Sequence, residues 1–231
     1  MMPVRTRGII AATVAAVVTS ACGSTSSGRS TVESAPRPAA SAQGVDAGIA
    51  KARADSMRYP YTEADIHFMS GMIGHHAQAI VMAGWAPSHG ASASVQNLAA
   101  RIVNAQRDEI VTMQTWLRDR RQPVPEASAH GMKMMMDGVE HVMLMPGMLT
   151  EEQLKQLDEA RGKEFDRLFL TFMIQHHTGA VAMVKELFGT YGAAQDELVF
   201  KFASDVNVDQ TTEIARMQRM LFALALEGNT P

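Results

Sequence analysis

The chain has 231 residues, and its 46% hydrophobic content is enough for one large or two small packed domains. Its formal charge is −3, which becomes −5 without the first 21 residues because 19 basic residues then stand against 24 acidic ones. This balance argues against a nucleic-acid-binding surface. Cys22 is the only cysteine, so a disulfide or a cysteine-based metal site cannot form within one chain.

The N-terminus, residues 1–21, has the pattern of an export signal. A short basic region precedes an apolar run over 9–18 that is too short to span a bilayer. The segment Thr-Ser-Ala at 19–21, followed by Cys22, resembles the lipobox of bacterial lipoproteins, although Thr19 stands where an aliphatic residue is usual. We expect lipid attachment at Cys22 and a place on the periplasmic side of the cell envelope. The alternative is plain cleavage that frees a soluble periplasmic or secreted protein.

Residues 22–57 are mainly small or polar and contain few large apolar side chains. Such a composition predicts a flexible tether that forms no core. The folded domain is therefore expected over 58–228.

Two long helices are predicted in the first half of this domain. The first begins at Thr62, which forms a capping box with Asp65, and its apolar period ends near Pro87 and Gly90. The second covers about 92–120 and stops before two prolines.

The connector over 123–149 is rich in methionine, with seven methionines in the nineteen residues 130–148. Two interpretations stay open. The methionines could form a weak sulfur site for Cu(I) or Ag(I), or they could cap the end of a helical bundle.

The second half begins with a short helix capped by Thr150 and Gln153. Long helices are predicted over about 162–188 and 194–226 from their apolar period.

The two halves are internal repeats. Asp65–Met82 aligns with Asp166–Met183 at eight identical positions of eighteen, and Gln106–Leu117 aligns with Gln210–Leu221 at six of twelve. Two helical hairpins can bury their apolar stripes against each other, so we predict an all-α four-helix bundle. Repeat one spans 58–122, the connector 123–149 and repeat two 150–228.

Each repeat contains a Met-x-x-His-His motif that points to a metal. On a helix turning about 100° per residue, Asp65, Met72 and His76 share one stripe, and His75 lies one turn after Met72. The partner helices carry Glu-x-x-x-Met, which places a carboxylate and a thioether on one face. The candidate metal ligands are His75, His76, His176, His177, Met72, Met173, Asp65, Asp166, Glu109, Glu213, Met113 and Met217.

Thioether sulfur selects Cu(I) as the first choice, with silver possible and iron or manganese less suited. The carboxylates could orient the imidazoles instead of binding the ion. A buried polar network without metal is an alternative, and so are methionines that only pack the core. His67 points away from the stripe and His89 sits at a helix end, so both are expected in solvent.

The Asp65–Met82 and Asp166–Met183 segments resemble the bacterial family called domain of unknown function 305, and the resemblance spans about 59–226. It implies a ferritin-like helical bundle in an exported protein, and copper binding linked to copper tolerance in some members.

The predicted function is metal binding without catalysis, in which the domain stores or buffers Cu(I) or passes it to another envelope copper-handling protein. No catalytic motif is apparent. Oligomers are possible, the membrane is reached through Cys22, and nucleic acid is not an expected partner. A ferritin-like di-iron or di-manganese oxidoreductase is one alternative, although such sites use Glu-x-x-His pairs. A metal-free structural module is the other.

Overall fold

The computed structural model describes residues 46–51, 53–54, 60–136 and 138–228. The predicted export signal and Cys22 lie outside these ranges. Part of the predicted tether, residues 46–51 and 53–54, is helical and almost entirely exposed. Its alanine-rich sequence favours a helix, but the segment contributes no buried side chain to the core.

Five helices follow, and their bounds agree closely with the prediction. Thr62 and Asp65 form the capping box expected at the first helix, and Thr150 and Gln153 form the one expected at the short helix. The last helix begins three residues later than predicted, because the Asp196 carboxylate caps it by accepting hydrogen bonds from the amides of residues 198 and 199. The helices are α2 (Glu63–Gly84), α3 (Ala93–Asp119), α4 (Glu151–Glu159), α5 (Gly162–Gly189) and α6 (Glu197–Gly228).

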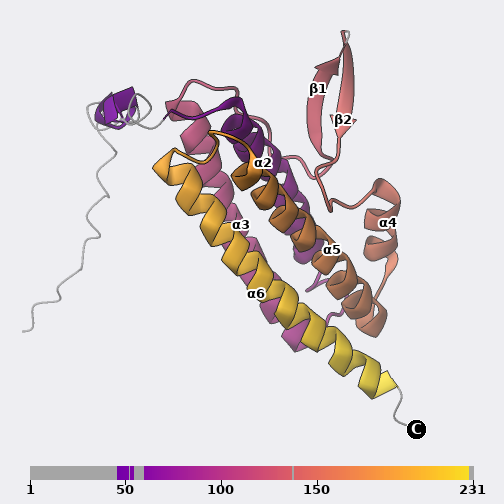
Figure 1. Cartoon of the computed structure of the whole chain (residues 1–231). Helices are drawn as coiled ribbons and strands as arrows, with labels where there is room; N and C mark the ends of the chain where they lie inside the picture. The colour runs from indigo at the N-terminus through magenta and orange to yellow at the C-terminus, as the bar shows by residue number, and fades with distance from the viewer. Residues whose placement is uncertain (1–45, 52, 55–59, 137, 229–231) are drawn as a thin grey trace, which may run out of the picture. The chain divides into compact units, whose positions relative to one another are not determined.

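The long helices form two hairpins, α2 with α3 and α5 with α6, and the hairpins meet where α2 packs against α5 (Figure 1). The prediction of an all-α bundle is therefore confirmed. Apolar side chains from all four long helices fill two core clusters between them. Within the described part of the chain, none of the helices combines the length and the apolar character needed to cross a membrane.

The connector between the hairpins contains a feature that the prediction lacked. Strands β1 (Met132–Met136) and β2 (Val139–Met143) pair antiparallel, with Met132 opposite Met143. Gly138 has φ +79°, a conformation that suits glycine at the tight turn between them. Met145 and Met148, after β2, are buried in the core, as the capping interpretation requires.

Two equivalent positions of the repeats hold the end of the connector against the bundle. Gln78 on α2 donates to the Leu149 carbonyl over 3.0 Å and accepts from the Leu149 amide over 2.6 Å. The aligned position on α5 is Gly179, where a Cβ atom would lie only 1.8 Å from the Pro146 carbonyl oxygen. The side-chain amide of Gln78 thus holds the backbone at Leu149, and the missing side chain at Gly179 lets the backbone at Pro146 lie against α5.

Candidate metal centre

The two histidine doublets lie on the facing helices α2 and α5. All four imidazoles, His75, His76, His176 and His177, are completely inaccessible to solvent. Burial of four polar rings is costly unless their nitrogen atoms find partners, so the surroundings of each nitrogen decide what the cluster can do.

The inner pair is His75 and His176, whose ring centroids are 3.8 Å apart with the planes tilted by 40°. His75 Nε2 lies 3.0 Å from the Pro146 carbonyl oxygen. Since a carbonyl only accepts, Nε2 carries the proton and Nδ1 keeps the lone pair. Both nitrogens of His176 are buried without a hydrogen-bond partner among the described residues.

The outer pair is His76 and His177, and each donates to a glutamate of its own hairpin. His76 Nε2 lies 2.6 Å from Glu109 Oε2 on α3, and His177 Nε2 lies 2.7 Å from Glu213 Oε2 on α6. The carboxylates therefore fix the tautomer in which Nδ1 is free to bind an ion. This orienting role for the glutamates is one of the two that the sequence left open.

Burial keeps the inner imidazoles neutral. Desolvation, followed by the charge of His76, lowers the pKa of His75 to about 3. Desolvation and then the charge of His75 lower the pKa of His176 well below its ordinary value. A neutral imidazole is the form that binds metals, so these rings stay available to an ion in mildly acidic conditions.

The same shifts predict how the stability of the metal-free protein depends on pH. The folded-state pKa values of both histidines are depressed, so the unfolded chain binds protons that the folded core excludes, for His75 between about pH 6.5 and 3. Stability should be complete above pH 6.5 and fall by about 1.4 kcal/mol per pH unit for one such histidine as the pH drops. Urea unfolding midpoints measured from pH 7 to pH 5, above the range where most carboxylates titrate, test this. A flat profile would contradict the neutral, buried state.

Four methionines of the predicted set are buried as completely as the histidines. Met72 and Met113 belong to one core cluster, and Met173 and Met217 belong to the other, so each repeat supplies one pair. Met72 and Met173 each lie one helical turn before a histidine doublet.

The two aspartates of the predicted set have other partners. Asp65 accepts from Thr62 and, over 2.7 Å, from the amide of Ala194 in the loop between α5 and α6. Asp166 accepts over 3.1 Å from the amide of Ser92, the N-cap residue of α3. Each repeat thus uses its aspartate to hold a loop of the other repeat. Asp65 and His76 are also eleven residues apart, which corresponds to about 16 Å along the helix axis, so they cannot share one ion.

The nitrogen and oxygen donors of the described residues do not by themselves make up a complete metal site. In the described ranges, no three His, Cys, Asp or Glu side chains are grouped so that they could hold an ion by themselves. An ion bound here would therefore have at most two of these imidazoles as ligands. Thioether sulfur is the other soft donor in the predicted set, and mixed nitrogen and thioether ligands favour Cu(I) or Ag(I).

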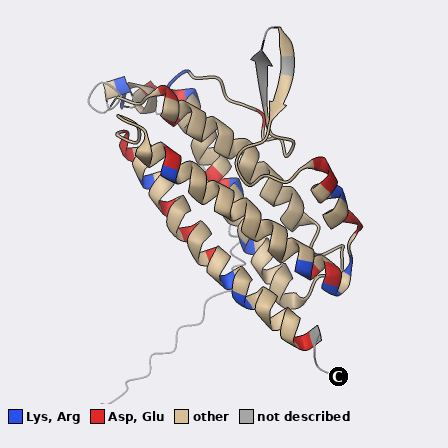
Figure 2. Cartoon of the chain, turned by 45° about the vertical axis from the view of Figure 1, so that its right-hand side comes forward, with Lys and Arg blue, Asp and Glu red and all other residues tan. Residues whose placement is uncertain are grey.

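Two groups near the histidines were not predicted. The Pro146 carbonyl, which binds His75, belongs to the backbone and has no sequence signature. Asp209 belongs to a series of acidic positions along α6 that Figure 2 shows recurring turn after turn. Burial, and then Glu109 and Glu213, raise the pKa of Asp209, so it lies near both outer carboxylates. Its aligned position in repeat one is Ala105, so comparing the repeats could not reveal it.

The prediction that His89 lies in solvent is wrong. Its side chain is buried, with Nε2 2.9 Å from both the backbone oxygen and the carboxylate of Asp158, at the end of α4. The contact comes from a helix 69 residues later, which local periodicity cannot foresee. His67 is exposed, as predicted.

The histidine doublets and their glutamates lie within a segment that matches a known protein family. The sequence profile of the family described as "Domain of unknown function (DUF305)" matches residues 65–221, more than half of the chain, including both histidine doublets and both glutamates. The chain belongs to the DUF305 family. No curated protein matches it significantly.

Solved DUF305 structures share the fold. A DUF305 protein from Streptomyces coelicolor, described as a candidate secreted protein, is 27% identical with a TM-score of 0.59, over 70% of this chain and 94% of that one. A DUF305 fragment from Deinococcus radiodurans is 28% identical with a TM-score of 0.59, over 71% and 99%. CopM in its Cu(II)-bound form is 28% identical with a TM-score of 0.54, over 69% and 96%. CopM has also been crystallised in Cu(I)-bound and Ag-bound forms.

Proposed function

We propose that this DUF305 domain binds Cu(I) between its two repeats, without catalysis, and buffers the ion or passes it to another envelope protein. The observation that carries the proposal is the state of the four buried histidines: five of their ring nitrogens have no hydrogen-bond partner in the described structure. Buried polar atoms without partners are costly, and a bound cation would satisfy them.

The chemistry of the ligands supports the choice of metal. Neutral imidazoles and thioethers suit Cu(I) and Ag(I), whereas oxygen-rich sites suit harder ions. The similarity to CopM, which binds copper and silver, supports the same choice.

A titration of the purified protein with Cu(I) against a competing chelator tests the proposal. We expect tight binding by the natural protein and a loss of at least about 100-fold in affinity when His75, His76, His176 and His177 are all replaced by glutamine. A Met69→Leu variant, which alters a buried methionine outside the predicted set, is the control. Equal affinity in the natural and four-histidine proteins would refute the proposal.

The orienting glutamates provide a second test. Replacing Glu109 or Glu213 by glutamine removes the charge that holds His76 or His177 in its tautomer. We expect each change to weaken Cu(I) binding by about 10- to 100-fold, the usual cost of losing such a partner. Glu164→Gln, at an exposed glutamate paired with Arg167, should leave the affinity unchanged. Undiminished affinity in both glutamate variants would show that the carboxylates do not support the ion.

The location of the protein is proposed from the sequence, since residues 1–45 lie outside the described ranges. The lipobox-like segment before Cys22 supports a lipid anchor in the cell envelope. Fractionation of cells producing the Cys22→Ser variant should then show the chain leaving the membrane fraction. If the natural protein is itself found only in the soluble fraction, the lipid anchor is refuted and plain secretion is the correct interpretation.

A further inference from the structure

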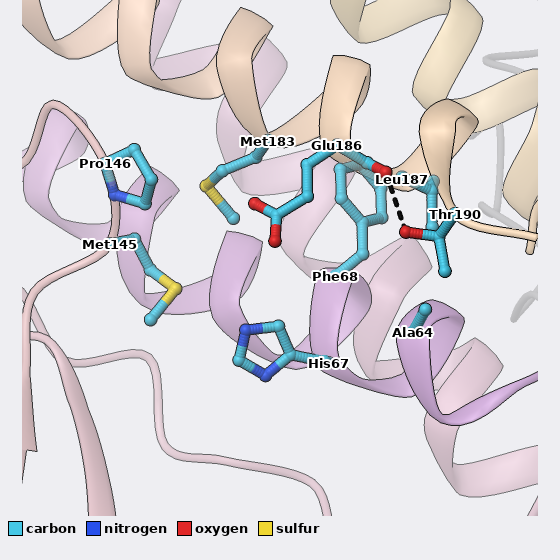
Figure 3. Close-up of a pocket in the computed structure, with 9 residues that line it drawn as sticks. All are labelled: Ala64, His67, Phe68, Met145, Pro146, Met183, Glu186, Leu187 and Thr190. Atoms are coloured by element: carbon cyan, nitrogen blue, oxygen red, sulfur yellow. Dashed lines mark hydrogen bonds between the residues drawn. The ribbon is translucent and has the colours of Figure 1, made fainter.

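A pocket on the surface of the bundle combines soft metal ligands outside the buried histidine cluster. It encloses about 70 Å³ and is lined by residues of α2, α5 and the end of the connector. Figure 3 shows the side chains of His67, Met145, Met183 and Glu186 arranged around this space. That volume exceeds the space of one water molecule and suffices for an ion with a residual water ligand.

The side chains of Met145 and Met183 both contact α2 at Gly71. A Cβ atom at Gly71 would lie 2.7 Å from the sulfur of Met145 and 3.5 Å from the terminal methyl group of Met183. The two methionine side chains therefore converge on one spot of α2. Both residues are almost fully buried, so the structure holds their side chains in place.

The imidazole of His67 and the carboxylate of Glu186 line the pocket and are exposed to solvent. His67 is exposed and lies one helical turn before Gly71, on the same face of α2. Glu186, on α5, is also exposed and lines the same pocket. The set thus contains one nitrogen and two sulfur donors, with a negative charge that attracts cations.

The pocket and the histidine cluster are connected along α2 and at Pro146. His67, Gly71 and His75 follow one another at four-residue spacing along α2, about 6 Å apart along its axis. Pro146 lines the pocket, and its carbonyl oxygen accepts the hydrogen bond from His75. A cation held by Met145 and Met183 would therefore be separated from the buried imidazoles by about one helical turn.

We propose that His67, Met145 and Met183 form an outer site that captures a soft monovalent cation, Cu(I) or Ag(I), and supplies it to the buried histidines. The ligand set is the kind that such ions prefer, and its exposed imidazole gives access from solvent. This inference rests on the proposed function for the inner cluster but concerns a different set of residues.

The test uses Ag(I) and the full protein with ¹³C-labelled methionine methyl groups, observed by NMR. Methionine-to-leucine variants, which keep side-chain volume, assign the signals of Met145 and Met183. We expect these two signals to shift together at the first additions of Ag(I), while the signal of Met69 stays unchanged. The two shifts should persist in the variant in which all four buried histidines are glutamine.

A second, kinetic experiment measures by stopped flow the rate at which Ag(I) binds to the four buried histidines. In the combined Met145→Leu and Met183→Leu variant, loading should slow by at least about tenfold compared with Met69→Leu, and His67→Gln should act in the same direction. If the natural protein binds Ag(I) but the Met145 and Met183 signals do not move, or the double variant loads at the control rate, the outer site is refuted while the inner site stands. If no Ag(I) binds to the natural protein, the proposed function fails as well.

Discussion

Replacing His176 by leucine should stabilise the metal-free protein by about 1 to 3 kcal/mol and at the same time weaken Cu(I) binding. Both nitrogens of His176 are buried with no partner in the described part of the chain, so the folded apo-protein carries the cost of removing them from water. Leucine is similar in size and has no polar atom to satisfy. Urea unfolding in the presence of a strong chelator measures the first effect, and chelator competition measures the second.

The matched control is His177→Leu, which makes the same change in the same helix. His177 donates to Glu213 over 2.7 Å, so leucine there leaves a partly buried carboxylate without its partner. We expect that variant to be destabilised, in the opposite direction from His176→Leu. If both variants lose stability equally, His176 has a partner in solution, and the argument from its unpaired nitrogens is wrong.

Gly179→Ala should be the most damaging single change outside the histidines, with a loss of about 3 kcal/mol or more. The added Cβ would lie 1.8 Å from the Pro146 carbonyl oxygen and 2.6 Å from the Cα of Gly147, so the backbone of the connector must move. That movement would also separate Pro146 from His75, and Cu(I) affinity should fall with stability. Thermal unfolding and metal competition on the same variant measure both effects.

Gly189→Ala provides the comparison, because a Cβ at this last residue of α5 meets no atom of the described residues within 4 Å. Alanine there should be neutral or raise stability by up to about 1 kcal/mol, since it is the better helix former. Equal melting temperatures for the two alanine variants would mean that the connector does not rest against α5 in solution.

Much of this fold was predictable because its signals are local. Thr62 with Asp65, and Thr150 with Gln153, start helices through contacts three residues apart, which a sequence displays directly. The repeat added a non-local conclusion, that two hairpins face each other, and the structure confirms it by packing α2 against α5.

The roles within the candidate site were less predictable because they depend on contacts between distant segments. Helical periodicity places Asp65 and His76 on one stripe, but the distance along the helix keeps them apart. In the folded chain, Asp65 instead accepts a hydrogen bond from the amide of Ala194. The same periodicity left His67 as a solvent residue, whereas folding brings Met145 and Met183 to its side. His89 was misplaced for the same reason, since its partner Asp158 belongs to another helix.

The amino-acid sequence alone determined the helices, the repeat and the identity of the buried histidine doublets, because caps, apolar period and motif identity are properties of neighbouring residues. Only the tertiary structure decided that one nitrogen of His75, His76 and His177 has a hydrogen-bond partner, whereas neither nitrogen of His176 has one among the described residues. Those outcomes depend on Glu109, Glu213 and the Pro146 carbonyl, which reach the histidines from other elements of the bundle. The buried face of a helix can be predicted from the helix's own residues, because its period is local. The groups that contact this face come from other segments, so they depend on how the chain packs.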